Sequence, residues 1–166
     1  MLEKGSVEST LVPGPVHYAT LRAGSGPSDD LPILLWLHGG GGSETFLASC
    51  RPQFVECWRE KSLPDVVVAT PAAGWSFYLD RLDGSEQWEQ FLLHELVPHI
   101  RKETGSTRGP LLLGGISVGA VAALRMSFKR PELIHAVAAV EPTMEAALRA
   151  DDVPLRDQVQ MPGAIR

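Results

Sequence analysis

With 166 residues, of which 44% are hydrophobic and 21% are charged, the chain has the composition of an ordinary globular protein with a single domain. Its formal net charge of −5 and its scattered Lys and Arg residues exclude a basic surface for nucleic acid. No apolar run approaches the roughly 20 residues that span a bilayer, and residues 1–6 lack the apolar segment of a secretory signal, so we expect a cytoplasmic protein with no nucleic-acid or membrane partner.

The first third of the chain predicts two strands and a glycine-rich loop. Residues 1–15 end in a stretch rich in proline and glycine and predict an irregular lead-in. Residues 16–21 alternate in the manner of a strand, and the continuous apolar run 33–37 is typical of a strand that is covered on both faces. This second strand leads into His38 and four consecutive glycines, residues 39–42.

Strands and helices alternate along the rest of the chain. The expected elements are a helix after Ser43, a strand at 66–69, a helix from 83–86 to Ile100, a strand at 110–113, a helix at 118–129 and a strand at 135–140. This alternation predicts the α/β class, with a parallel sheet that carries helices on both faces. We interpret residues 1–166 as one domain, whose last residues, 151–166, contain two prolines and no clear period and are expected to be irregular.

Ser117 stands in the pentad Gly-Ile-Ser-Val-Gly, residues 115–119, between the predicted strand at 110–113 and the predicted helix at 118–129. This strand-turn-helix setting is that of a nucleophile elbow. Two glycines flank the serine because a β-carbon at either position would collide with neighbouring backbone, and the strained turn presents the hydroxyl at the sheet edge. Ser117 is therefore the predicted nucleophile.

The glycine run meets a second need of acyl transfer, which is a set of N–H donors for the oxyanion. In a parallel sheet, the loop after residues 33–37 opens on the same edge as the loop that carries Ser117. We expect the N–H of Val118 to be one donor and that of Gly40 the other, with Gly41 as the second choice. A phosphate-binding loop is the alternative for these glycines, but no Gly-Lys-Ser/Thr sequence follows them.

His94, Glu95 and His99 suggest a zinc site, but metal-binding helices place their histidines four residues apart. A spacing of five turns the second histidine about 140° away from the first. We therefore expect His99 to pack within the fold, and we expect neither a metal nor a cofactor.

Four segments together resemble a known family: residues 35–42, 95–100, 114–120 and 130–133. Over roughly residues 30–145 they are similar to the putative esterase family of α/β-hydrolases, which includes esterase D, also called S-formylglutathione hydrolase, and the mycolyl transferases. The resemblance implies a three-layer sandwich with a mostly parallel sheet and a small-molecule ester or thioester as substrate. It also implies Ser117 as the nucleophile and the backbone around Gly40 and Val118 as the oxyanion hole.

The chain departs from this family after Ser117. Family members continue through two more strands that bring an aspartate and then a histidine, whereas only 49 residues (166 minus 117) follow Ser117 here. We therefore interpret the chain as a partial domain, truncated at its C-terminal side with an incomplete sheet. His135 begins its strand at the opposite edge, and His38 is expected to shape the glycine loop. Glu141, at the end of the strand 135–140, is the candidate acid.

Two further features concern ligands and partners. Trp75, Phe77 and Tyr78 follow the predicted strand 66–69 and would either contact the acyl or alcohol group of a substrate or cover the core. Without further strands, residues 135–140 become an exposed sheet edge, which predicts self-association.

Two functions fit these observations. The first is a serine hydrolase of carboxylic esters or thioesters that acts through an acyl-enzyme and is weakened or inactive because the downstream acid and histidine are absent. In a well-studied serine protease, loss of the base alone costs roughly 10⁶ in turnover. The second is a truncated or pseudo-hydrolase without catalysis that only binds a ligand or partner.

Overall fold

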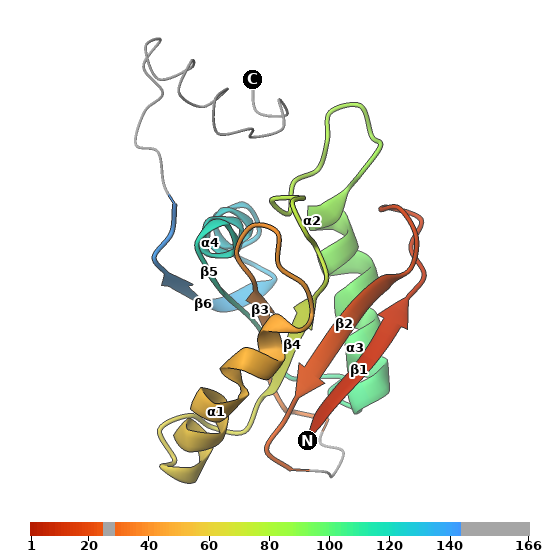
Figure 1. The fold of residues 1–166 in the computed structure, drawn as a ribbon. Helices are drawn as coiled ribbons and strands as arrows, with labels where there is room; N and C mark the ends of the chain where they lie inside the picture. The colour runs from red at the N-terminus through yellow and green to blue at the C-terminus, as the bar shows by residue number, and fades with distance from the viewer. Residues whose placement is uncertain (25–28, 144–166) are drawn as a thin grey trace.

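The computed structural model describes residues 1–24 and 29–143, which form a six-stranded mixed sheet in the order β1-β2-β4-β3-β5-β6 (Figure 1). The strands are β1 (Leu2–Val7), β2 (Val16–Leu21), β3 (Ile33–Leu37), β4 (Val67–Pro71), β5 (Leu111–Ile116) and β6 (Ile134–Val140). β4, β3, β5 and β6 run parallel to one another, whereas β2 is antiparallel to both β4 and β1. The predicted parallel sheet is thus confirmed for its four central and C-terminal strands.

The prediction of an irregular lead-in over residues 1–15 is wrong, because this segment contains β1. β1 pairs with β2 along its whole length, from Leu2 opposite Leu21 to Val7 opposite Val16. No β1 side chain is fully buried, so the strand is held by backbone pairing at the sheet edge. Its sequence therefore lacks the apolar alternation from which a strand is predicted. The tail at 151–166 lies outside the described residues.

Helices cover both faces of the sheet, as expected for the α/β class. One face carries α2 (Trp88–Phe91), the π-helical turn η1 (Leu92–Leu96), α3 (Val97–Thr104) and α4 (Val118–Lys129), and the other carries α1 (Phe46–Arg59). The larger core contains the fully buried Leu35, Leu37, Phe91 and Ile100, which lie between the sheet and the first group of helices. A smaller core lies under α1, with Leu47 at its centre.

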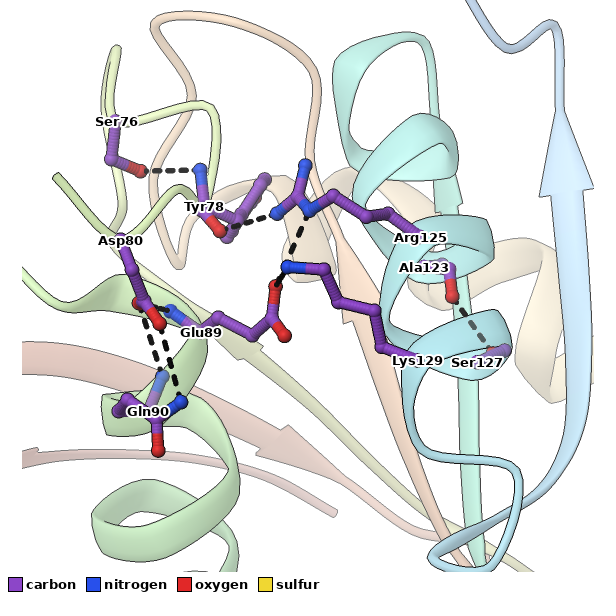
Figure 2. A network of polar contacts seen from close by, with 9 residues as sticks. All are labelled: Ser76, Tyr78, Asp80, Glu89, Gln90, Ala123, Arg125, Ser127 and Lys129. Atoms are coloured by element: carbon purple, nitrogen blue, oxygen red, sulfur yellow. Dashed lines mark hydrogen bonds and ion pairs between the residues drawn. The ribbon is translucent and has the colours of Figure 1, made fainter. Parts of the chain in front are cut away.

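The helix predicted from residues 83–86 begins later, at Trp88. The Asp83 carboxylate accepts the backbone N–H and the hydroxyl of Ser85 in a local turn, at 3.0 and 2.7 Å. The carboxylate of Asp80 caps the helix instead, because its Oδ1 accepts the backbone N–H groups of Glu89 (2.8 Å) and Gln90 (3.3 Å), as Figure 2 shows. A side chain outside the helix therefore fixes where it starts.

β6 forms one edge of the sheet, as predicted. It pairs with β5 on one side, and within residues 1–24 and 29–143 no strand pairs with its other side. Of its seven residues only Ile134 is buried, and Val137 and Val140 are 38% and 42% exposed. The same ranges contain no helix of the length and apolar character that a bilayer crossing requires.

Candidate active site

The carboxyl ends of β3 and β5 lie side by side, because Leu37 pairs with Gly115 at the end of the shared ladder. The chain after β5 enters Ser117 and α4, and the chain after β3 enters His38 and the glycine run. The two segments touch, since a β-carbon built on Gly39 would lie 3.6 Å from the Cβ of Ser117. The predicted nucleophile and the predicted oxyanion loop therefore lie at one place on the sheet edge.

Ser117 occupies a strained backbone conformation, with φ 57° and ψ −123°, in a region that residues with a β-carbon seldom adopt. Its N–H donates to the carbonyl of Val140 at 3.0 Å, and its carbonyl accepts the N–H of Val121 at 3.2 Å, so the turn is tied to β6 and to α4. The strain rotates the side chain out of the sheet at the first turn of the helix, which is the geometry of an elbow.

The two glycines of the pentad allow this turn to lie close to β3. A β-carbon on Gly115 would lie 2.7 Å from the Leu37 carbonyl oxygen, and one on Gly119 would lie 2.3 Å from it. The β-carbon on Gly119 would also lie 2.5 Å from the carbonyl oxygen of His38. Both contacts are with backbone, which cannot rotate away, so larger residues are excluded at both positions.

The hydroxyl of Ser117 has a partner that the sequence did not indicate. Its Oγ lies 2.9 Å from the Oγ1 of Thr143, which follows β6. All five histidines of the chain fall within the described residues, and none of them hydrogen-bonds to the Ser117 hydroxyl. A threonine hydroxyl cannot act as a general base at neutral pH, so Ser117 has no base in hydrogen-bond contact among residues 1–24 and 29–143.

His38 organises the glycine loop. Its imidazole is 1% exposed, and its Nε2 accepts the backbone N–H of Ala73 at 3.1 Å. Because a backbone N–H can only donate, the proton of the neutral ring is on Nδ1, which donates to the Gly39 carbonyl at 2.6 Å. Burial lowers the pKa of His38 and outweighs the opposing effect of its backbone contacts. Both ring nitrogens are thus hydrogen-bonded to backbone, one in the glycine loop and one in the loop after β4, which rules His38 out as the base for Ser117.

This arrangement of His38 predicts a pH dependence of stability. A histidine with a lowered pKa in the folded state binds its proton more readily when unfolded, so its contribution is complete above about pH 6.5 and is lost as the pH falls towards the folded pKa. We expect the free energy of unfolding to fall by up to about 1.4 kcal/mol per pH unit through this group. Urea titrations of the wild type and of His38→Gln should show the difference between them shrinking with falling pH. A difference that stays constant from about pH 7.5 to 5 would contradict a buried neutral His38.

The two candidate oxyanion donors in the glycine loop differ in their hydrogen bonding. The Gly41 N–H donates to the carbonyl of Gly74 at 2.9 Å and is therefore occupied. The structure gives the Gly40 N–H no hydrogen-bond acceptor within the described parts of the chain. The carbonyl of Gly39 is held by His38 and by the Gly42 N–H (3.2 Å), and in a trans peptide the next N–H points the opposite way. The Gly40 N–H is thus fixed in direction and available, which favours it over Gly41.

Val118, the first residue of α4, contributes an N–H of the kind that has no partner inside a helix. The N-terminal end of the helix dipole adds a positive potential at the same point. Val118 and Gly40 thus belong to the two segments that meet at Ser117.

The three aromatic residues after β4 separate into two groups. The indole of Trp75 is 66% exposed and lies on the glycine loop, where a β-carbon on Gly40 would be 2.6 Å from the ring. Phe77 is half-buried, with its ring centroid 6.3 Å from that of Trp75. Tyr78 is only 1% exposed and packs in the larger core. The first two are accessible at the rim of the site, whereas Tyr78 is not placed to contact a substrate, and its predicted role there is corrected.

The remaining candidates lie at different places. Glu141 directly follows β6 at the same sheet edge as Ser117, is exposed, and has a φ of 47°. His135 stands at the start of β6, at the opposite edge. Away from the site, the Nε2 of His99 lies 3.0 Å from the Tyr18 hydroxyl, and Glu95 accepts the hydroxyls of Ser9 and Thr10. The packing role expected for His99 is thus confirmed.

A family model described as "Putative esterase" matches residues 24–150, more than three quarters of the chain. The chain belongs to this esterase family. The matched range contains the glycine loop, the elbow and β6. No curated protein sequence matches the chain.

Several solved structures resemble this family member in fold at low sequence identity. They include a ferulic acid esterase (TM-score 0.72, 17% identity, 92% of this chain and 63% of that one) and an S-formylglutathione hydrolase from Agrobacterium tumefaciens (0.71, 18%, 86% and 58%). A third is the substrate-bound, fluorophosphonate-binding serine hydrolase FphF of Staphylococcus aureus (0.71, 12%, 92% and 60%). The chain thus has the α/β-hydrolase fold that the sequence predicted, and it spans 58–63% of the length of these three proteins.

Proposed function

We propose that the site cleaves carboxylic esters or thioesters of small molecules through an acyl-enzyme on Ser117. In this reaction the Ser117 hydroxyl loses its proton to solvent, its Oγ attacks the carbonyl carbon, and the N–H groups of Gly40 and Val118 hold the oxyanion. As the carbonyl re-forms, the bond to the leaving group breaks and the departing alkoxide or thiolate takes a proton from water. A water molecule then hydrolyses the acyl-enzyme, which releases the acid and restores the Ser117 hydroxyl. The observation that carries the proposal is the strained Ser117 turn packed against a glycine loop whose Gly40 N–H has no acceptor among the residues that the structure describes. Membership of the esterase family supports the same reaction.

The proposed reaction of this chain is slow. A serine hydroxyl is a weak nucleophile until a base removes its proton, and in the described part of the chain the Ser117 hydroxyl hydrogen-bonds only to Thr143. Loss of the base costs roughly 10⁶ in the turnover of a serine protease, while oxyanion stabilisation and binding retain part of the rate. Glu141 stands where an acid could orient a histidine, but the residues next to it in the sequence include no histidine.

Intact-protein mass spectrometry after incubation with p-nitrophenyl acetate tests this proposal. We expect one acetyl group per chain, mapped to Ser117 by peptide analysis and absent in Ser117→Ala. An acetyl thioester should give the same acetylated Ser117, at a rate that depends on its thiolate leaving group. A chain that remains unmodified, or one acetylated equally in Ser117→Ala, would support the alternative of a family member that binds a ligand without catalysis.

Trp75 and Phe77, at the rim of the site, suggest the shape of the acyl or alcohol group that the site binds. The bridge between Gly42 and Gly74 holds the backbone before Trp75 on the glycine loop, and the exposed Trp75 ring lies over Gly40 in the same loop that meets Ser117 at Gly39. We infer that a planar aromatic acyl or alcohol group stacks there, with Phe77 at its edge. The fold shared with ferulic acid esterases is compatible with such a substrate.

Replacement of Trp75 tests this inference. In Trp75→Ala we expect the concentration of an aryl fluorophosphonate that half-saturates labelling to rise about fivefold relative to that of an alkyl one, since stacking contributes about 1 kcal/mol. Phe128→Ala provides a matched control, because Phe128 is 78% exposed but lies near the far end of α4. An unchanged preference in Trp75→Ala, or an equal loss in both variants, would exclude Trp75 as the binding surface.

A further inference from the structure

Tyr78 connects the core to the glycine loop. Its hydroxyl donates to the backbone carbonyl of His38 at 3.0 Å, across 40 residues of sequence. The same carbonyl oxygen lies against the first turn of α4, where a β-carbon on Gly119 would approach it to 2.5 Å. His38 in turn fixes the Gly39 carbonyl and hence the direction of the Gly40 N–H. The hydroxyl of Tyr78 therefore holds the segment from which the proposed oxyanion donor extends.

Tyr78 is itself held by the helix that carries the nucleophile. The Nη2 of Arg125, in α4, donates to the backbone carbonyl of Tyr78 at 2.6 Å. The Nε of Arg125 lies 3.3 Å from the carboxylate of Glu89, which also accepts the ammonium of Lys129 at 3.3 Å (Figure 2). The side chain of Glu89 is 4% exposed, so this carboxylate is desolvated and its two cations are held close to it.

The backbone at Phe77 and Tyr78 is strained, and the contacts of Arg125 and Glu89 hold it in place. Phe77 and Tyr78 are consecutive non-glycine residues with φ of 53° and 55°. Such residues persist only where the surroundings hold them in place. Here the Arg125 guanidinium holds the Tyr78 carbonyl, and the turn delivers the phenol beneath the glycine loop. A tyrosine needed only to fill the core would not require this turn or this buried ion pair.

We propose that Tyr78, fixed by Arg125 and Glu89, is a positioning residue that sets the glycine loop relative to the nucleophile helix. Because Arg125 belongs to α4, one chain of contacts fixes both the helix that supplies Ser117 and Val118 and the loop that supplies Gly40. The proposal rests on the proposed ester chemistry for its catalytic consequence, but the coupling of Tyr78 to the loop stands on the hydrogen bonds alone.

Tyr78→Phe removes only the hydroxyl, and Tyr18→Phe is the matched control. Tyr18 is also buried in the larger core and also loses a hydrogen bond to a histidine, but its partner is His99, away from the site. We expect the limiting rate of fluorophosphonate labelling to fall about tenfold in Tyr78→Phe at an unchanged half-saturating concentration, because the donor and the nucleophile lose their alignment. Tyr18→Phe should be labelled like the wild type even if both variants lose similar stability. Equal labelling in the two variants, measured where both are folded, would overturn the proposal.

Hydrogen exchange of the His38 ring supplies a readout that needs no activity. The Nδ1–H of His38 donates to the Gly39 carbonyl and should give a protected NMR signal. We expect its exchange to accelerate at least about tenfold in Tyr78→Phe and to be unchanged in Tyr18→Phe. If the wild type is not labelled at all, the proposed ester chemistry fails, and this exchange result alone decides the positioning role. Unchanged exchange in Tyr78→Phe would then reject it.

Discussion

Replacing Gly119 with alanine is expected to destabilise the protein by about 3 kcal/mol or more, the largest loss of stability that we predict for a single methyl group. The added β-carbon would lie 2.3 Å from the Leu37 carbonyl oxygen and 2.5 Å from that of His38. Both are backbone atoms of the strand and loop beneath α4, so relief requires the helix to move away from β3. The helical preference of alanine over glycine, about 1 kcal/mol, is too small to offset this clash.

Thermal unfolding measures this effect directly. A loss of 3 kcal/mol should lower the Tm of a protein of this size by roughly 10 °C. Gly24→Ala is the control, because Gly24 is exposed and its added β-carbon would meet nothing within 4 Å. An unchanged Tm for Gly119→Ala would show that α4 does not lie against β3 as closely as described, and the geometry of the elbow would have to be revised.

Ser117→Gly is expected to abolish labelling and yet to stabilise the fold relative to Ser117→Ala. The φ of 57° and ψ of −123° at Ser117 cost a residue with a β-carbon about 1–3 kcal/mol, which glycine does not incur. Glycine in turn loses about 0.5–1 kcal/mol more conformational entropy on folding than alanine does. The difference leaves the glycine variant about 1 kcal/mol more stable than the alanine variant.

The comparison of these two variants isolates the strain, because both lose the hydroxyl and its contact with Thr143. Urea unfolding should give a higher midpoint for Ser117→Gly than for Ser117→Ala at an equal slope. Equal midpoints, or a lower one for the glycine variant, would mean that the turn is not strained. The site would then lack the conformational signature on which its interpretation as an elbow depends.

The elbow and the glycine loop could be predicted because close backbone contacts require glycine at fixed positions, and these glycines can be recognised in the sequence. Gly115 and Gly119 have no alternative residue, and an apolar strand before them with a helix after them places Ser117 at a sheet edge. The parallel direction of four strands followed from the alternation of strands and helices, whereas their order in the sheet was not predicted. These inferences rest on patterns that can be read within short stretches of the sequence, even where the contacts behind them, such as those of Gly119 with Leu37 and His38, join distant residues.

What could not be predicted rests on contacts between distant residues. β1 contains Glu3, Lys4, Gly5 and Ser6, and only pairing with β2 makes them a strand. The position of Tyr78 in a loop did not reveal whether its side chain faces a substrate or the core. Its burial and its hydrogen bond to the His38 carbonyl show that it faces the core. No sequence pattern indicates that both ring nitrogens of His38 are hydrogen-bonded to backbone or that the Gly41 N–H already has an acceptor.

The rate of fluorophosphonate labelling as a function of pH tests the central claim most directly. That claim is that Ser117 is a preformed esterase nucleophile without a base in contact. The measurement follows intact mass against time from about pH 6 to 9 and maps the modified residue. We predict a single label on Ser117, formed at a rate that rises about tenfold per pH unit without a plateau, because only the serine alkoxide reacts. Labelling elsewhere or none at all would contradict the nucleophile, and a plateau above an inflection near pH 6.5 would reveal a histidine base.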